Sequence, residues 1–150
     1  MKHLITVCLC LGGAALASPS PAQTEQPQTF YCTTEFGGHQ YKGYRPKWVV
    51  FQIVPGASKV IANDPMTLAQ SLTVKANQRV QDDGKIALRW RLSVPTTLGY
   101  SMGGTIRVKF DPVSRSGTIQ SSIPSRLVDG GRQDGTVACE ITDRSKVLNR

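Results

Sequence analysis

The sequence predicts an all-β domain, folded as a small antiparallel meander barrel of about eight strands. Three observations lead to this fold class. Apolar and polar residues alternate along most of the chain with the period of two that marks a half-buried strand. No crossover helix separates two strands, so neighbouring strands should pair antiparallel. A cysteine in the first strand and another in the last favour closure of the sheet; a β-sandwich is the alternative.

The predicted strands follow one another along the whole body of the chain. In the clearest of them Leu88 and Trp90 face inward, whereas Arg89 and Arg91 face outward. Only the segment 64–71 is expected to hold a short helical turn. The strands are expected, in order, at residues 29–36, 48–54, 58–62, 71–80, 85–94, 104–110, 117–123 and 135–141.

Alternation also assigns individual residues to the core and to the turns. Gly84 and Gly117 lie in the turns 81–84 and 111–117, where we expect them to adopt positive φ. Other inward positions of the strands on either side of 85–94 are Leu72, Val74, Ala76, Val80, Ile106, Val108 and Phe110.

The strand 48–54 departs from simple alternation because it is apolar on both faces. It is therefore expected to be covered on both sides, or else partly exposed at a partner surface. The segment before the first strand or the loop 39–48 would supply the cover.

The first residues have the features of a signal peptide. Lys2 precedes an apolar run that is too short to span a bilayer as a helix, and Ala15 and Ala17 predict cleavage after Ala17. The expected location is periplasmic or secreted, with no transmembrane segment in the mature chain. The expected parts of the chain are a signal peptide at 1–17, a disordered spacer at 18–28, a single β domain at 29–143 and a C-terminal tail at 144–150.

Two cysteines remain after cleavage, and an even pair in an exported chain predicts one disulfide. Cys32 shares the inward parity of Phe30, and Cys139 shares that of Val137. A Cys32–Cys139 bridge would therefore join the first and last strands. Two cysteines and one histidine without ligand spacing predict no metal site.

The chain is basic, with 18 Lys and Arg residues against 10 Asp and Glu residues, and only Lys2 leaves with the leader. Outward positions of three consecutive strands carry cations, with no carboxylate between them. These cations are Lys75, Arg79, Arg89, Arg91, Arg107 and Lys109.

Pairing Val80 with Ile86 would place Arg89 opposite Asn77 and Arg91 opposite Lys75. A similar register in the next hairpin would place Arg91 opposite Arg107 and Arg89 opposite Lys109. A shift of two residues would keep the faces and change these partners.

Like charges that face each other across strands destabilise a sheet, and an anionic partner would compensate them. A merely solvated barrel exterior is the alternative interpretation. The candidate partners are an anionic envelope component, such as a lipid headgroup or a glycan, or an acidic protein. Nucleic acid is disfavoured because aromatic residues for stacking bases are missing from that face. The oligomeric state does not follow from the sequence.

The loop 39–48 is a second candidate contact because it combines tyrosine with cations, which are common at protein interfaces. Alternatively, its tyrosine rings cap the barrel end and leave their hydroxyls in water. The contact residues expected in this loop are Tyr41, Lys42, Tyr44, Arg45 and Lys47.

No catalytic set and no cofactor motif are expected. His39 is the only histidine after the leader, and it lies in a Gly-flanked loop without a nucleophile motif. The sequence therefore predicts an exported, non-enzymatic binding or inhibitor-like module of the bacterial cell envelope. It would contact an anionic partner through the basic strand face or the 39–48 loop. The alternative is a carrier of a small apolar ligand, which an interior filled by residues such as Trp90 and Phe110 would prevent.

Overall fold

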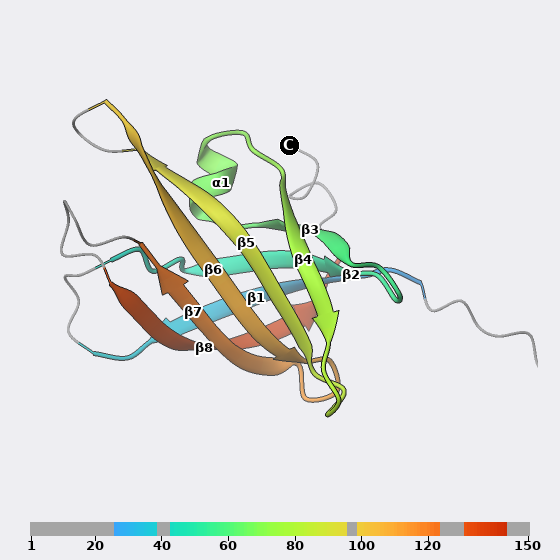
Figure 1. Ribbon diagram of the computed structural model, residues 1–150. Coiled ribbons are helices and arrows are strands. Elements are labelled where there is room, and N and C mark those ends of the chain that lie inside the picture. The colour runs from blue at the N-terminus through green and yellow to red at the C-terminus, as the bar shows by residue number, and fades with distance from the viewer. Residues whose placement is uncertain (1–25, 39–42, 96–98, 124–130, 144–150) are drawn as a thin grey trace, which may run out of the picture.

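A computed structural model describes residues 26–38, 43–95, 99–123 and 131–143. Its strands form one closed barrel in which each strand pairs antiparallel with the next, and β8 pairs back with β1 (Figure 1). The predicted meander barrel is confirmed, and the sandwich alternative is wrong. The strands are β1 (Gln28–Phe36), β2 (Trp48–Ile53), β3 (Lys59–Asn63), β4 (Val74–Val80), β5 (Ile86–Pro95), β6 (Ser101–Asp111), β7 (Ser116–Ser122) and β8 (Arg132–Ile141).

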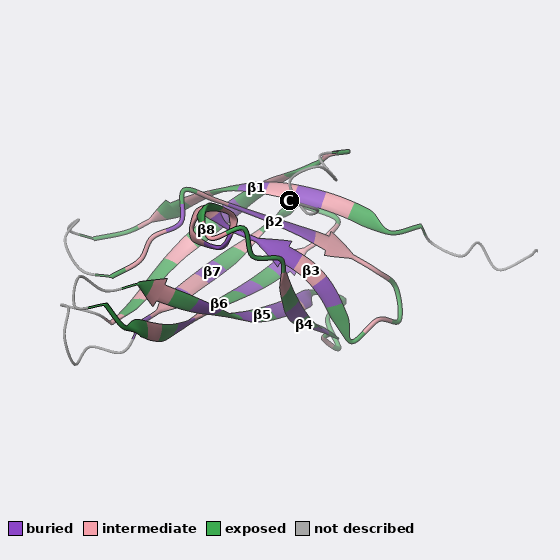
Figure 2. Ribbon diagram, turned by 90° about the horizontal axis from the view of Figure 1, so that it is seen from above, coloured by how far each residue is buried: buried purple, intermediate pink, exposed green. Residues whose placement is uncertain are grey.

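The barrel interior is filled by aromatic and branched side chains. Phe30, Phe51 and Phe110 form a ring cluster with centroid distances of 4.7 to 5.9 Å. Trp90 and Leu88 are buried beside them. Figure 2 shows buried and exposed positions alternating along the strands, as the period of two requires.

The closing seam of the barrel lies between β1 and β8. Seven residue pairs join the two strands, from Phe30 opposite Ile141 to Phe36 opposite Gly135. In the middle of the seam Cys32 lies opposite Cys139, and the two form the predicted disulfide. The first and last strands are therefore joined by both backbone pairing and a covalent bond.

One short helix, α1 (Pro65–Ala69), interrupts the meander between β3 and β4, within the segment where a helical turn was expected. Asp64 caps it, because its side chain accepts hydrogen bonds from the backbone N–H groups of Met66 and Thr67. In an antiparallel meander the β1–β2, β3–β4, β5–β6 and β7–β8 connections share one end of the barrel. We call this the α1 end.

Two residues assigned to the core by alternation lie elsewhere. Leu72 precedes β4 and is 43% exposed, because the chain leaving α1 enters the sheet only at Val74. Val80 pairs with Ile86 as predicted but is 62% exposed, since it ends its strand at the barrel rim. The parity of a residue predicts which face of the sheet its side chain lies on. It does not predict whether that side chain is buried, because side chains at the rim of the barrel stay exposed on either face.

In the turn between β6 and β7 the residue with positive φ is not the predicted one. Gly84 has the expected positive φ, but in the second turn Arg115, not Gly117, takes the left-handed conformation, with φ 53°. Gly117 lies within β7, where a Cβ atom would come within 2.0 Å of the Lys109 carbonyl oxygen. Glycine is needed there because two backbone segments approach closely.

The register of the β5–β6 hairpin differs by two residues from the prediction. Arg89 lies opposite Arg107 and Arg91 opposite Thr105, so the predicted Arg91–Arg107 and Arg89–Lys109 pairs are wrong. At the loop end of the hairpin the last pair is Pro95 with Ser101, and a connection of this length fixes every other pair along the two strands. All these side chains keep their predicted outward direction.

The apolar strand β2 is covered on both faces at its centre. Val49 and Phe51 belong to the inner core, and Val50, which points the other way, is also fully buried. Tyr31 lies opposite Val50, and its ring stacks on Trp48 at a centroid distance of 5.9 Å. Most of the spacer and the first part of the 39–48 loop, residues 39–42, lie outside the described residues, so this prediction about the cover is not tested there.

Loss of the seam disulfide should weaken the barrel strongly. The bond joins residues 107 positions apart, and we expect the Cys32→Ala/Cys139→Ala variant to lose about 2–5 kcal/mol of unfolding free energy. Guanidinium denaturation measures this difference. Thr33→Ala, in the adjacent pair of the seam, is the control and should change little. An unchanged denaturation midpoint in the double variant would contradict this account of the seam.

Gly117→Ala should be destabilising by about 1–3 kcal/mol, because the new methyl group overlaps the Lys109 backbone. Gly103→Ala, in β6, is the matched control, since an added Cβ there meets no atom within 4 Å. Thermal unfolding of both variants makes the comparison. Equal midpoints would show that the close approach at Gly117 is not what excludes a side chain.

Candidate functional site

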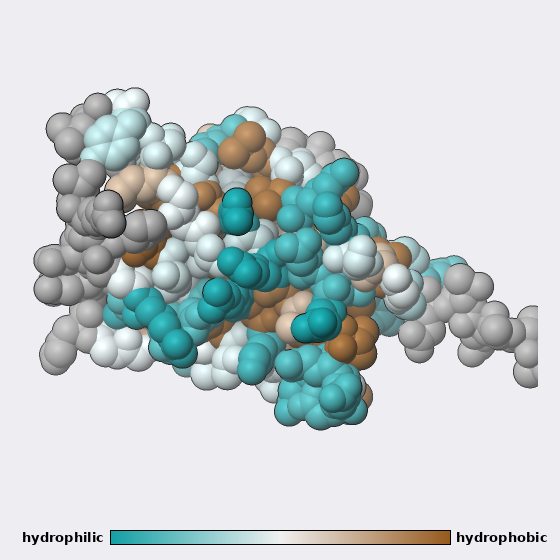
Figure 3. Space-filling view, viewed as in Figure 1, coloured by the Kyte–Doolittle hydropathy of each residue, from teal (hydrophilic) through white to brown (hydrophobic). Residues whose placement is uncertain are grey.

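The six predicted cations share the outer surface of three adjacent strands. All six are exposed, and we call this surface, formed by Lys75, Arg79, Arg89, Arg91, Arg107 and Lys109, the basic face. The inward neighbours of these residues, such as Leu88 and Val108, are buried and fix the cations in the outward positions. Figure 3 shows hydrophilic side chains across the front of the molecule, over β4 to β6.

A row of directly opposed residues crosses the basic face and continues beyond it. Each member lies opposite the next on the neighbouring strand, with Arg89 and Arg107 at its centre. We call this set the central row, and it consists of Lys59, Asn77, Arg89, Arg107, Gln120 and Asp134, from β3 to β8. Of its five pairs only Asn77 with Arg89 was predicted from the sequence, because the other pairs depend on registers that alternation does not fix.

The basic face has little internal charge compensation. Within the described parts of the chain, no ion pair joins any of its six cations to a carboxylate. The ion pairs that are found, Lys85 with Asp83 and Arg132 with Asp134, lie outside it. Arg107 donates instead to the neutral Gln120 amide oxygen at 3.1 Å.

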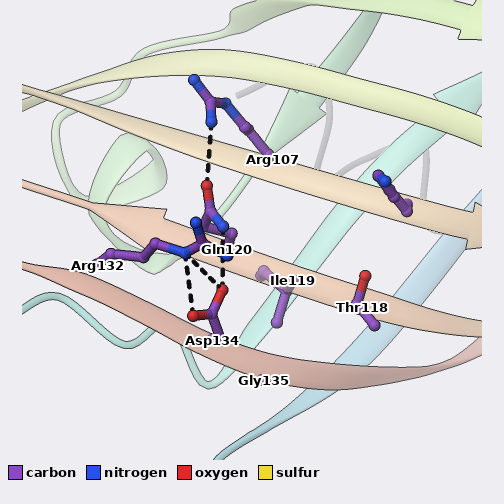
Figure 4. Close-up of a pocket in the computed structure, with 8 residues that line it drawn as sticks. Arg107, Thr118, Ile119, Gln120, Arg132, Asp134 and Gly135 are labelled. Atoms are coloured by element: carbon purple, nitrogen blue, oxygen red, sulfur yellow. Dashed lines mark hydrogen bonds and ion pairs between the residues drawn. The ribbon is translucent and has the colours of Figure 1, made fainter.

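Figure 4 shows how the central row ends in a hydrogen-bonded chain. Gln120 accepts from Arg107 and donates to Asp134 at 3.0 Å, and Asp134 also accepts from the Arg132 guanidinium. The Gln120 hydrogen bond, followed by that of Arg132, holds the pKa of Asp134 below its ordinary value. The chain orients Gln120 and Arg107 on the surface and keeps one carboxylate charged at the end of the row.

Shallow grooves lie along both sides of the Arg89–Arg107 pair. The groove of Figure 4 has a volume of about 460 Å³ and is lined by residues that include Lys109 and Thr118. On the other side a groove of about 310 Å³ is lined by residues of β4 and β5, which include Asn77 and Arg89. The basic face is therefore an outer surface with shallow grooves, and it does not contain a deep pocket.

The predicted loop contacts turn out to be divided in their roles. Tyr41 and Lys42 lie outside the described residues, and Lys47 is exposed. The Arg45 guanidinium donates to Gln133 at 2.6 and 2.9 Å and to the backbone carbonyls of residues 37 and 38. Arg45 therefore ties its loop to β8 and to the end of β1, which is a structural role.

Tyr44 also has a structural role, and the expectation that its hydroxyl stays in water is wrong. It donates to the buried Asp64 carboxylate at 2.6 Å. The same carboxylate accepts from the Trp90 indole N–H at 3.0 Å, in addition to the two backbone groups of α1. Asp64 thus joins the β1–β2 loop, α1 and β5 at the α1 end.

This Asp64 cluster was missed by sequence reasoning. Asp64 is followed directly by Pro65, and Thr67 lies three positions after Asp64. This pattern is typical of a helix N-terminus and could have identified the capping role of Asp64. Nothing local links Asp64 to Tyr44 or Trp90, which are 20 and 26 positions away.

The described residues contain no group of three or more His, Cys, Asp or Glu side chains able to hold a metal ion. His39 lies outside the described residues. None of the helices in the described ranges is long and apolar enough to cross a membrane.

Removing the Tyr44 hydroxyl should destabilise the α1 end. Hydrogen bonds to a charged acceptor contribute about 1.5–3 kcal/mol, so we expect Tyr44→Phe to cost about that much at neutral pH. Chemical denaturation of both proteins gives the difference. Thr136→Val, which removes an exposed hydroxyl group on β8, serves as the control. Equal losses in the two variants would show that the Asp64 contact contributes nothing particular.

The Tyr44 contribution should also depend on pH. Burial, and then the Asp64 charge, raise the pKa of Tyr44 above its ordinary value of 10.0. Above that pH the unfolded chain ionises at Tyr44 while the folded protein does not, so folding loses free energy. The advantage of the native protein over Tyr44→Phe should therefore be complete below about pH 10 and shrink at higher pH. A difference that stayed constant up to about pH 11 would contradict this.

Repulsion between Arg89 and Arg107 should be measurable. We expect Arg89→Gln to raise the unfolding free energy by about 0.2–1 kcal/mol at low ionic strength, with the gain vanishing in high salt. Arg79→Gln is the matched control, because Arg79 lies opposite the neutral Ala87. If both variants gain equally, the effect reflects net charge and not the facing pair.

Comparison with protein-family models, with curated proteins and with solved structures found no match for this chain. Any functional conclusion must therefore come from the geometry and charge of the surfaces described above.

Proposed function

We propose that this protein is an exported, non-enzymatic binding or inhibitor-like module of the bacterial cell envelope, which contacts an anionic partner through the basic face. The observation that carries the proposal is the basic face itself. Its six exposed cations occupy adjacent strands, and among the residues that the structure describes none of them forms an ion pair with a carboxylate.

The arrangement favours a partner over simple solvation. Arg89 and Arg107 are directly opposed, and Arg91 and Lys109 flank them on the same two strands. Such placement costs stability in the free protein, and an anion bound between the side chains would offset that cost. The grooves on either side leave room for a partner to approach the guanidinium groups.

Export is part of the proposal, and the disulfide supports it. Structural disulfides such as Cys32–Cys139 persist mainly in oxidising compartments, which include the periplasm and the extracellular space. This fits the leader-like segment predicted at residues 1–17.

The basic face is a better contact candidate than the 39–48 loop. Arg45 and Tyr44 make internal hydrogen bonds that hold the α1 end together. Their replacement would disturb the fold. The six cations of the basic face are exposed, and a partner can contact them without any change in the barrel.

The carrier alternative receives little support from the interior. The three-phenylalanine cluster and Trp90 occupy the space in which a ligand would lie. An apolar groove of about 390 Å³ exists at the end opposite α1, but it opens at the rim, between residues such as Pro55 and Pro112.

Charge reversal at the centre of the face tests the proposal. We expect wild-type protein to bind its own envelope fraction at low salt and to be released as the salt concentration rises. Arg89→Glu/Arg107→Glu should weaken that binding at least about tenfold, measured by quantitative pull-down over a range of protein concentrations.

The control for this experiment is Lys85→Glu/Arg115→Glu, which changes the net charge equally at the turns of the opposite end. It should bind almost as well as the wild type. An equal loss in both variants would mean that net charge alone governs binding. Full binding by the central variant would mean that the basic face is merely solvated.

A further inference from the structure

We infer that the partner of the basic face is a linear acidic polysaccharide, bound across the strands along the central row; this rests on the proposed function. Three features of the surface point to this class of ligand: the length of the row, its curvature around the barrel, and the neutral polar groups that flank its central pair of arginines.

The length of the row indicates an extended ligand. From Lys59 to Gln120 the row takes four steps between neighbouring strands, which at about 4.8 Å each span roughly 19 Å. Cations stand at its start and at its centre. A compact anion would contact only the Arg89–Arg107 pair, whereas a chain with repeated charges can use the whole row.

The curvature of the row favours a flexible chain over a flat surface. The row passes over six consecutive strands, β3 to β8, of a closed barrel of eight. A planar bilayer touches a barrel along one side and cannot reach both ends of the row, Lys59 and Asp134, together. A polymer can bend around the barrel and follow the three grooves that lie beside the row, the third of which is lined by Lys59 and Lys75.

The neutral polar groups favour a ligand that carries hydroxyl groups as well as charge. Asn77 and Gln120 flank the central Arg89–Arg107 pair, one on each side, and Thr118 lines the groove beside Arg107. The row ends at Asp134, whose carboxylate accepts hydrogen bonds from hydroxyl groups, which a sugar carries and a polyphosphate chain lacks. Cations, amides and one carboxylate acceptor together match a uronic acid polymer better than a polyphosphate.

Calorimetric titration of the full-length protein with defined oligomers tests this inference. The probes are galacturonate oligomers of about two, four and eight units, chosen to fall short of or to span the roughly 19 Å row. Affinity should rise at least about tenfold between the shortest and the longest, while a neutral dextran oligomer should not bind. Equal affinity for all galacturonate lengths would overturn the extended binding mode.

Two variants separate the inference from the proposed function. Asn77→Ala/Thr118→Ala keeps all charges and the Arg107–Gln120 hydrogen bond, and we expect it to weaken galacturonate binding about five- to tenfold but leave polyphosphate binding unchanged. Arg89→Glu/Arg107→Glu should abolish both. Gln26→Ala/Gln28→Ala is the matched control, because it removes two exposed amides at the end of the barrel opposite the α1 end. This variant should bind like the wild type.

The outcomes are distinguishable. If polyphosphate binds as tightly as galacturonate, and the Asn77→Ala/Thr118→Ala variant behaves like the wild type, the polysaccharide inference fails while the anionic-partner proposal stands. Binding to phosphatidylglycerol vesicles without binding to any oligomer would likewise replace the polysaccharide by a lipid surface. If no anionic probe binds, both the inference and the proposed function are wrong.

Discussion

Closure of the sheet between β1 and β8 is the constraint on which the rest of the structure depends. The seam pairs the first strand with the last and contains the Cys32–Cys139 bond. An open sheet of these strands would expose two unpaired edges and one side of its apolar core. Closure removes both edges and makes a single inner face, where Phe30, Phe51 and Phe110 meet although they come from distant parts of the chain.

A small closed barrel filled with side chains leaves its function to the outside and to the ends. At the α1 end the buried Asp64 carboxylate accepts hydrogen bonds from Tyr44, Trp90 and the first turn of α1. This cluster resembles a polar site in composition, but all its groups satisfy one another. A buried carboxylate needs such partners, because an unpaired charge would be costly in the apolar interior. The cluster is therefore best explained as part of the fold.

The basic face has the opposite character, because among the described residues none of its six cations pairs with a carboxylate. The inner core fixes the parity of β4 to β6, and this parity holds the cations outward. Pairing then places Arg89 opposite Arg107 and continues the row to Gln120 and Asp134. The proposed function depends on the cations alone, whereas the polysaccharide inference depends on the polar residues that pairing adds to them.

The sequence by itself determined the strands, their inward and outward faces, the disulfide pair and the outward direction of the cations. The strands and their faces follow from alternation with a period of two, which is a local property, and the disulfide pair follows from the two cysteines that remain after the leader. Alternation is unchanged by a shift of two residues, so it could not decide whether Arg89 faces Arg107 or Lys109. Only the tertiary structure decided the registers, the contacts of Asp64 with Tyr44 and Trp90, and the full length of the central row. These depend on loop lengths and on closure, which bring together residues that no local pattern connects.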